Sequence, residues 1–159
     1  MEIKYRSIGI IHSPFKDIQG MPIQPTGAAH IQGRIELWPE FSPGLKDLDG
    51  FSHLILLYHF HQVQGEELVV TPFMEVELRG IFATRAPKRP NPIGLSIVRL
   101  ISIEESTLYI ENVDILDETP LLDIKPYVPE FDHFSAERVG WLGKTRGEVR
   151  GKKSDGRFR

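Results

Sequence analysis

Alternation of apolar and polar residues along the chain predicts several short strands. Over residues 31–37, apolar positions or glycine alternate with polar and charged residues. A period of two is typical of a strand with one face in the core. The same alternation occurs over 75–79 and 108–111. We therefore expect three half-buried strands.

Three further segments, 3–12, 51–60 and 93–103, are more continuously apolar and rich in β-branched residues. Such runs are typical of strands that are buried on both faces. Only the short segments 43–48 and 135–139 favour a helix.

The predicted strands are separated by turn residues, with 12 prolines and 14 glycines in the chain. Many short strands with little helix indicate an all-β domain, an antiparallel sandwich or barrel with long loops. The strand–helix alternation of a doubly wound fold is missing. The sequence contains no Gly-x-Gly, so it has neither a dinucleotide fingerprint nor a phosphate loop.

Composition narrows the class of protein. The chain has 159 residues, which suits a single domain, and it contains no cysteine. Disulfide scaffolds, thiolate zinc sites and cysteine nucleophiles are thus excluded, and a reducing cytoplasm is favoured. We expect no membrane span, because no apolar run is long enough, and no signal peptide at the N-terminus.

The charge is uneven although the net charge is only −3. Residues 135–159 contain eight Lys or Arg and three acidic residues, so this tail carries +5 and residues 1–134 carry −8. We expect a domain over 1–134 and a basic, partly mobile tail over 135–159. The tail is either solvated or in contact with phosphates.

The loop at residues 84–92, here called the cationic loop, concentrates positive charge. Arg85, Lys88 and Arg89 lie within five residues, and three prolines stiffen the same stretch. A stiff loop loses little entropy on binding an anion, and Arg can hold a carboxylate or phosphate with two parallel bonds. The loop therefore predicts an anion site. The alternative is a rigid connection whose cations face water.

Three aspartates, Asp114, Asp117 and Asp123, follow a predicted strand. If they gather on one rim, they could bind a metal, hold ribose hydroxyls or pair with the cationic loop. The alternative for residues 117–120 is a turn with an Asx-type hydrogen bond.

His59 and His61 would point to the same face of a strand. Two imidazoles can begin a zinc site, but no third ligand is local. Core or hydrogen-bonded histidines are the favoured interpretation, and we expect no metal.

Several motifs together resemble the TsaA/TrmO-like family, in order over about residues 5–132. The most specific are Arg89–Gly94 and Asp123–Tyr127. The others are Ile8–Phe15, Gln24-Pro25, Gly50–Leu54, Phe60–Gln62, Phe82–Arg85 and Leu122. The chain resembles the compact form of the family, without the further C-terminal domain of larger bacterial members.

This resemblance implies a small β-barrel, a homodimer with its cofactor cleft near the interface, and S-adenosylmethionine as cofactor. The implied reaction is N6-methylation of N6-threonylcarbamoyladenosine at position 37, beside the anticodon of certain tRNAs. The implied cofactor contacts are Gln24, Pro25, Thr26, His61, Gln62, Arg85, Leu95, Glu111, Asn112, Val113 and Asp114. The implied tRNA contacts are Lys88, Arg89, Asn91 and Tyr127.

The chain departs from the family pattern at two positions. Glu118 stands where the family usually has glycine in Asp-Gly-Thr-Pro, and Ala86 stands where many members have Ser or Thr. If that glycine serves a positive φ, Glu118 is strained or the turn differs.

The residues suit methyl transfer. Arg85 can hold the cofactor carboxylate, Asp114 the ribose hydroxyls or the ammonium, and positioning supplies most of the catalysis. His61 and Asp117 are the candidate catalytic bases. The alternatives are a non-catalytic RNA- or anion-binding barrel, a metal-dependent hydrolase, and a methyltransferase with a different acceptor.

Overall fold

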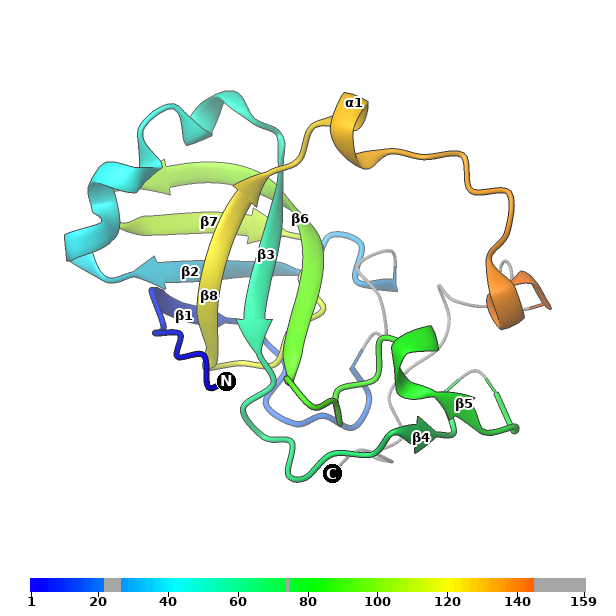
Figure 1. Ribbon diagram of the computed structural model, residues 1–159. Helices are drawn as coiled ribbons and strands as arrows, with labels where there is room; N and C mark the ends of the chain where they lie inside the picture. Colours follow the sequence, from blue (N-terminus) through cyan, green and yellow to red (C-terminus); the bar gives the residue numbers. More distant parts are fainter. Residues whose placement is uncertain (22–26, 74, 145–159) are drawn as a thin grey trace.

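Six strands close into an antiparallel barrel in the order β1-β2-β7-β6-β3-β8 (Figure 1). The computed structural model describes residues 1–21, 27–73 and 75–144. The predicted small antiparallel barrel is confirmed. Its strands are β1 (Gly9–His12), β2 (Gln32–Leu37), β3 (His53–His59), β6 (Ile93–Glu104), β7 (Thr107–Glu111) and β8 (Thr119–Pro126).

The remaining elements are short, as the near absence of helical periodicity predicts. A two-stranded sheet stands apart from the barrel, formed by β4 (Val69–Val70) and β5 (Arg79–Gly80). The helical elements are η2 (Pro39–Leu45), η3 (Leu48–Gly50), η4 (Ile81–Ala83), α1 (Pro129–Asp132) and η5 (Gly140–Lys144). None of the described helices is long and apolar enough to cross a membrane.

The barrel interior is filled by alternate residues of each strand. In β3 the residues Leu54, Leu56 and Tyr58 are buried, and their neighbours along the strand are more exposed. The same alternation occurs in the first half of β6. The expectation that these two segments are buried on both faces is therefore wrong: one side of each faces the interior and the other faces outward.

Other boundaries also differ from the prediction. Of segment 3–12 only β1 is a strand, and of segment 75–79 only Arg79 belongs to one. The helix expected at 135–139 is absent, and α1 forms a few residues earlier, where Pro129 occupies its first position. Segment 43–48 contributes to η2 and η3, which are 3₁₀ helices.

Strand β8 was not predicted, because Pro120, Asp123 and Pro126 interrupt its apolar pattern. It nevertheless pairs with β1 on one side and with β3 on the other, and so closes the barrel. Closure is a long-range interaction that a local pattern does not report.

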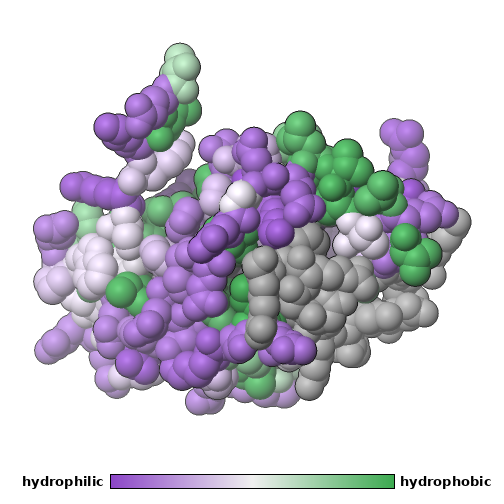
Figure 2. Space-filling view, turned by 90° about the horizontal axis from the view of Figure 1, so that it is seen from below, coloured by the Kyte–Doolittle hydropathy of each residue, from purple (hydrophilic) through white to green (hydrophobic). Residues whose placement is uncertain are grey.

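One end of the barrel carries the long connection from β3 to β6. His59 at the end of β3 pairs with Ile93 at the start of β6, and residues 60–92 between them contain β4, β5 and η4. Figure 2 shows hydrophobic side chains gathered on the side of the molecule that carries β4 and β5. This connection forms one wall of the main cavity.

Candidate functional site

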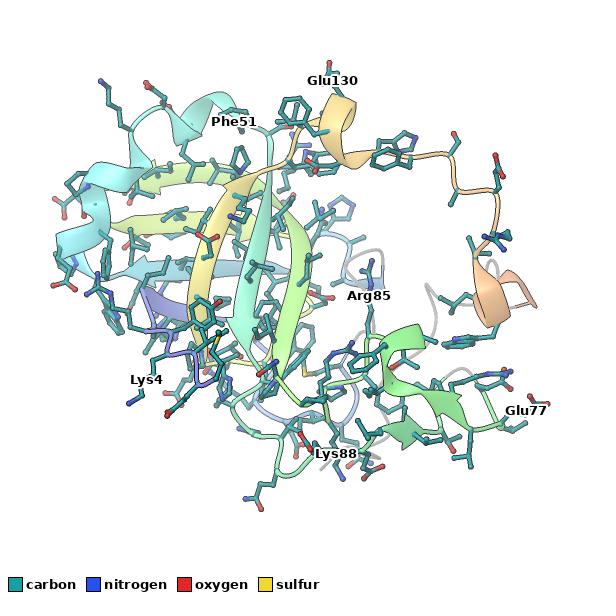
Figure 3. The ribbon with its side chains drawn as sticks, viewed as in Figure 1. Lys4, Phe51, Glu77, Arg85, Lys88 and Glu130 are labelled. Carbon is teal, nitrogen blue, oxygen red and sulfur yellow. The ribbon has the colours of Figure 1, made fainter. Side chains whose placement is uncertain are left out.

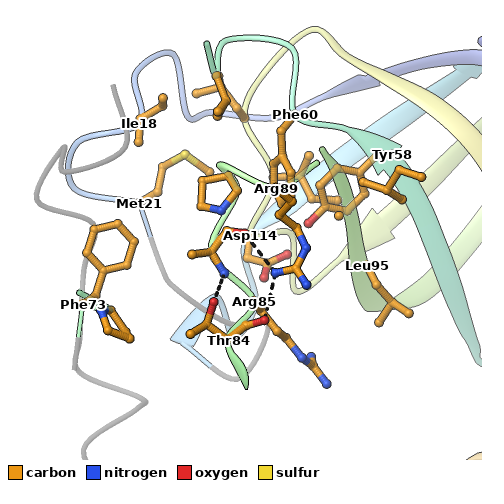
Figure 4. A pocket seen from close by; sticks show the side chains of 18 of the residues that line it. Ile18, Met21, Tyr58, Phe60, Phe73, Thr84, Arg85, Arg89, Leu95 and Asp114 are labelled. Atoms are coloured by element: carbon orange, nitrogen blue, oxygen red, sulfur yellow. Dashed lines mark hydrogen bonds between the residues drawn. The ribbon is translucent and has the colours of Figure 1, made fainter. Parts of the chain in front are cut away.

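A cavity of about 790 Å³ opens at this end of the barrel. Its volume is in the usual range for small-molecule sites, about 300–1000 Å³. Aromatic and aliphatic side chains dominate the lining, with Ile18, Met21 and Phe73 on one side and Tyr58, Phe60 and Leu95 on the other (Figure 4). The polar lining residues are His61, Gln62, Thr84, Arg85, Arg89, Asp114 and Thr119.

Asp114 provides the acidic group of the cavity. Its carboxylate accepts a hydrogen bond of 2.6 Å from the Ser96 hydroxyl, which lies 2.8 Å from the Tyr58 hydroxyl. Burial raises the pKa of Asp114 to about 6, although the Ser96 hydrogen bond and the charge of Arg85 act the other way. Burial and the nearby Asp114 also raise the pKa of Tyr58, so the phenol stays protonated.

Gly94 makes room for the Tyr58 ring. A Cβ at this position would lie 2.6 Å from Tyr58 Cζ and 2.9 Å from Phe60 Cζ, both closer than van der Waals contact allows. The two aromatic rings meet edge to face with centroids 5.6 Å apart. The glycine of the Arg89–Gly94 motif therefore packs the aromatic wall beside Asp114.

The three cations of the cationic loop have different environments. Arg85 is exposed, lines the cavity and points away from the loop, whereas Lys88 lies at the lower edge and pairs with Glu67 at 3.0 Å (Figure 3). Arg89 turns inward. Its Nη1 donates to the carbonyls of Ile81, Thr84 and Ala86 at 3.2, 2.9 and 3.2 Å.

Thr84 completes the loop. Its hydroxyl donates to Ile81 O at 2.9 Å and accepts from Ala86 N at 3.1 Å. The loop is thus held by an internal arginine and a threonine as well as by its prolines. Arg85 is the cation of this loop that is both exposed and on the cavity wall.

His61 lies on the cavity wall just after β3. Its Nδ1 is 3.4 Å from the Thr119 hydroxyl. Burial and the neighbouring His59 lower the pKa of His61 below 6.5, against the opposite effect of Glu118 and Asp117. The ring is therefore mostly neutral at neutral pH and can accept a proton.

Asp117 does not line this cavity. Its carboxylate accepts from Ser13 N at 2.9 Å, pairs with Lys16 and lies 3.5 Å from His12 Nδ1, in a separate groove of about 420 Å³. Burial alone would raise the pKa of Asp117, but the Lys16 and Ser13 hydrogen bonds lower it. The three aspartates do not gather on one rim. Asp114 lines the cavity, Asp117 lies in the separate groove, and Asp123 pairs with Lys125 at 2.8 Å on the barrel surface.

The turn after Asp117 has the conformation that the missing glycine would favour. Glu118 has φ of 62°, in the left-handed region. Of the two expectations for Glu118, strain or a different turn, this positive φ favours the first, because the left-handed region costs a residue with a Cβ more than it costs glycine.

Several residues predicted to contact the cofactor or tRNA do not line the cavity. Tyr127 donates its backbone N–H to His53 O, at the opposite end of β3. Glu111, Asn112 and Val113 precede the lining, which instead continues from Asp114 through Ile115 and Leu116. Asn91 is exposed and is not part of the lining. Gln24, Pro25 and Thr26 lie outside the described residues.

The predicted site residues do not include several lining or supporting side chains, among them Tyr58, Ser96, Phe73 and Trp141. A serine within the apolar run 93–103 was the available signal for Ser96, since a buried hydroxyl needs a partner. His59 and His61 are not on one strand, because β3 ends at His59. Among the residues that the structure describes, no three His, Cys, Asp or Glu side chains are grouped to hold a metal ion.

Comparison with known proteins agrees with this architecture. The sequence matches the family described as the tRNA-methyltransferase O N-terminal domain over residues 10–133. The chain belongs to the TrmO family. The predicted resemblance is thus confirmed. The crystal structure of TrmO from Pseudomonas aeruginosa is similar with a TM-score of 0.75 and 40% identity, covering 89% of this chain and 63% of that one.

Two relatives of this chain differ greatly in the share of their length that the match covers. A probable S-adenosyl-L-methionine-binding protein of Pyrococcus abyssi is 56% identical over 156 residues, which cover 98% of this chain and 85% of that protein. A tRNA (adenine(37)-N6)-methyltransferase of Mus musculus is 36% identical over 134 residues. The match covers 79% of this chain and 31% of the mouse protein, which is therefore much longer.

Proposed function

We propose that this chain is an S-adenosylmethionine-dependent methyltransferase acting on N6 of adenine 37 in tRNA. The observation that carries the proposal is the cavity itself, where Arg85 and Asp114 supply opposite charges within mostly apolar walls. The names of the Pyrococcus and mouse relatives support the cofactor and the reaction, respectively.

The charged groups of the cavity match those of the cofactor. S-adenosylmethionine has a carboxylate, an ammonium, a sulfonium and an adenosine. Arg85 binds the carboxylate with parallel hydrogen bonds. Asp114, held by Ser96, accepts from the ammonium or from the ribose hydroxyls. The apolar walls exclude water, which favours a reaction in which the sulfonium charge is lost.

The transfer is an in-line displacement. The nitrogen attacks the methyl carbon, the carbon–sulfur bond breaks, and the proton of N6 leaves to a base. His61 is the base in this proposal, because its ring is on the cavity wall and its lowered pKa keeps it neutral. Asp117 holds the segment near Ser13 through its hydrogen bond to that residue's N–H.

The acceptor that fits the proposal is N6-threonylcarbamoyladenosine in the anticodon loop. Its N6–H is amide-like, so a base assists the attack. An unstacked loop base can enter a pocket without opening a duplex.

The chain acts as a homodimer in this proposal. The outward side of β6 exposes Ile93, Leu95 and Ile101 at 38%, 44% and 49%. Leu95 also lines the cavity, so a partner on this face would adjoin the cofactor. Covering such a face is favoured because it removes apolar surface from water.

Calorimetric titration with S-adenosylmethionine and with S-adenosylhomocysteine tests the cofactor assignment. We expect saturable binding at about one site per chain. The affinity should fall at least tenfold in Arg85→Ala. Lys88→Ala is the matched control, because it removes a cation of the same loop that does not line the cavity. Folded protein that binds neither compound would leave a non-catalytic RNA-binding barrel as the better interpretation.

A further inference from the structure

The chain beyond the family match returns to the cavity. After α1 the backbone runs away from the barrel. Element η5 then lies beside β5 and η4, which belong to the connection between β3 and β6 (Figure 1). Trp141 and Leu142 line the cavity. The family match ends at residue 133, so part of this wall is built by a segment outside it.

Two contacts hold the Trp141 ring. Its Nε1 donates a hydrogen bond of 2.8 Å to Ala83 O, the last residue of η4. The Arg79 guanidinium lies 5.9 Å from the centre of the ring. Arg79 is in turn fixed by ion pairs to Glu75 at 2.7 Å and to Glu77 at 3.1 Å. A cation over an indole and a hydrogen bond at its edge together orient the ring.

This anchoring leaves apolar ring surface for the cavity. The only polar atom of the side chain is used by Ala83, so the ring offers no hydrogen bond to a ligand. Trp141 and Arg85 both line this cavity, and Ala83, which accepts the indole hydrogen bond, lies two residues before Arg85 in the chain. A cavity that offers both a flat apolar surface and a cation suits a ligand that has a planar ring and an anionic group.

We propose that Trp141 is a ligand-binding residue, against which a purine ring packs in the cavity. This inference rests on the proposed function, which brings two purines to the site, the adenine of the cofactor and the acceptor base. Base–aromatic stacking is sequence-tolerant and contributes on the order of five- to one-hundred-fold to binding. Trp141 and Leu142 thus supply part of the apolar wall of the site.

Two substitutions of Trp141 separate the ring from its hydrogen bond. Trp141→Ala removes both, whereas Trp141→Phe keeps an aromatic ring and loses the bond to Ala83. We expect Trp141→Ala to lose about tenfold or more in one of two quantities, and Trp141→Phe to retain most of the binding. A loss of S-adenosylhomocysteine affinity identifies the cofactor adenine as the source. A rise in KM for tRNA at saturating cofactor identifies the acceptor base.

Trp38→Phe is the matched control, because Trp38 is the other tryptophan and donates to Ser7 O on the barrel. We expect it to leave both quantities unchanged. In this variant Trp141 is the sole tryptophan, so its fluorescence reports on ligand packing without any change at Trp141. Quenching by S-adenosylhomocysteine or by tRNA is expected.

Three results would overturn the inference. One is Trp141→Ala with cofactor affinity and tRNA KM within twofold of the parent. Another is equal loss in Trp141→Ala and Trp141→Phe, since the hydrogen bond to Ala83 would then be the cause. The third is Trp141 fluorescence unchanged by either ligand. A parent protein that binds no S-adenosylhomocysteine contradicts the proposed function itself, which keeps the two failures distinct.

Discussion

Replacing Asp114 by asparagine should stabilise the free protein at neutral pH while weakening its binding of S-adenosylmethionine. Asparagine has nearly the same shape, and its carbonyl oxygen can still accept from Ser96. What the substitution removes is the charge. Burial raises the pKa of Asp114 from 3.8 to about 6, so the folded state disfavours the ionised carboxylate.

The magnitude follows from that shift. Each unit of pKa corresponds to about 1.4 kcal/mol, so the buried charge costs up to about 3 kcal/mol above pH 6. Asp114 keeps some solvent contact, and we expect about 1–3 kcal/mol. Between pH 6 and pH 3.8 the Asp114 carboxylate binds a proton in the folded state but not in the unfolded chain. Stability of the parent protein therefore gains from this group as pH falls from about 7 to about 4.

Urea unfolding of the parent and of Asp114→Asn between pH 4 and pH 8 measures this directly. The variant should be more stable by about 1–3 kcal/mol at pH 7.5, and the difference should vanish near pH 4. Asp123→Asn is the control, because Asp123 is paired with Lys125 at the surface and should change stability by less than about 0.5 kcal/mol. A variant that is less stable at pH 7.5, or a difference independent of pH, would refute the reasoning. Cofactor affinity should fall at least tenfold in Asp114→Asn and stay unchanged in Asp123→Asn.

Three further substitutions test the site. Glu118→Gly should raise the free energy of unfolding by about 0.5–1 kcal/mol in urea denaturation by removing the strain of a positive φ, whereas Glu118→Ala should not. Gly94→Ala should lower the melting temperature and cofactor affinity together, since its Cβ would displace the Tyr58 ring; an unchanged protein contradicts the close packing. Arg89→Ala should lower the free energy of unfolding by about 1–3 kcal/mol, because the carbonyls of Thr84 and Ala86 lose their donor, whereas Ile81 O keeps Thr84; wild-type stability would show that those bonds do not hold the loop.

The alternation at 31–37 and 108–111 predicts antiparallel strands that expose one side and bury the other, but it leaves a sandwich and a barrel open. The family resemblance is what favours the barrel. Prediction from the sequence fails where the local pattern and the fold disagree. Residues 75–79 alternate but contribute only Arg79 to a strand, while Pro120 and Pro126 conceal β8. These differences arise from pairing between distant segments, which local periodicity does not report.

For the site, the motifs identify His61, Arg85 and Asp114, which all line the cavity. They do not say how each is supported. Arg89 has the same charge as Arg85, yet it turns inward to backbone carbonyls, because the loop has acceptors to satisfy. Trp141 joins the wall from a segment 58 residues away from its partner Ala83, a contact that no local pattern encodes.

The measurement that tests the central claim most directly is methyl transfer to tRNA. Purified protein would be incubated with S-adenosylmethionine and tRNA bearing N6-threonylcarbamoyladenosine, and the nucleosides then analysed by mass spectrometry. The account predicts one added methyl group on that nucleoside, with none on tRNA that lacks the modification and at least a tenfold slower reaction with Arg85→Ala. Folded protein that binds the cofactor yet leaves this nucleoside unmethylated would contradict the account.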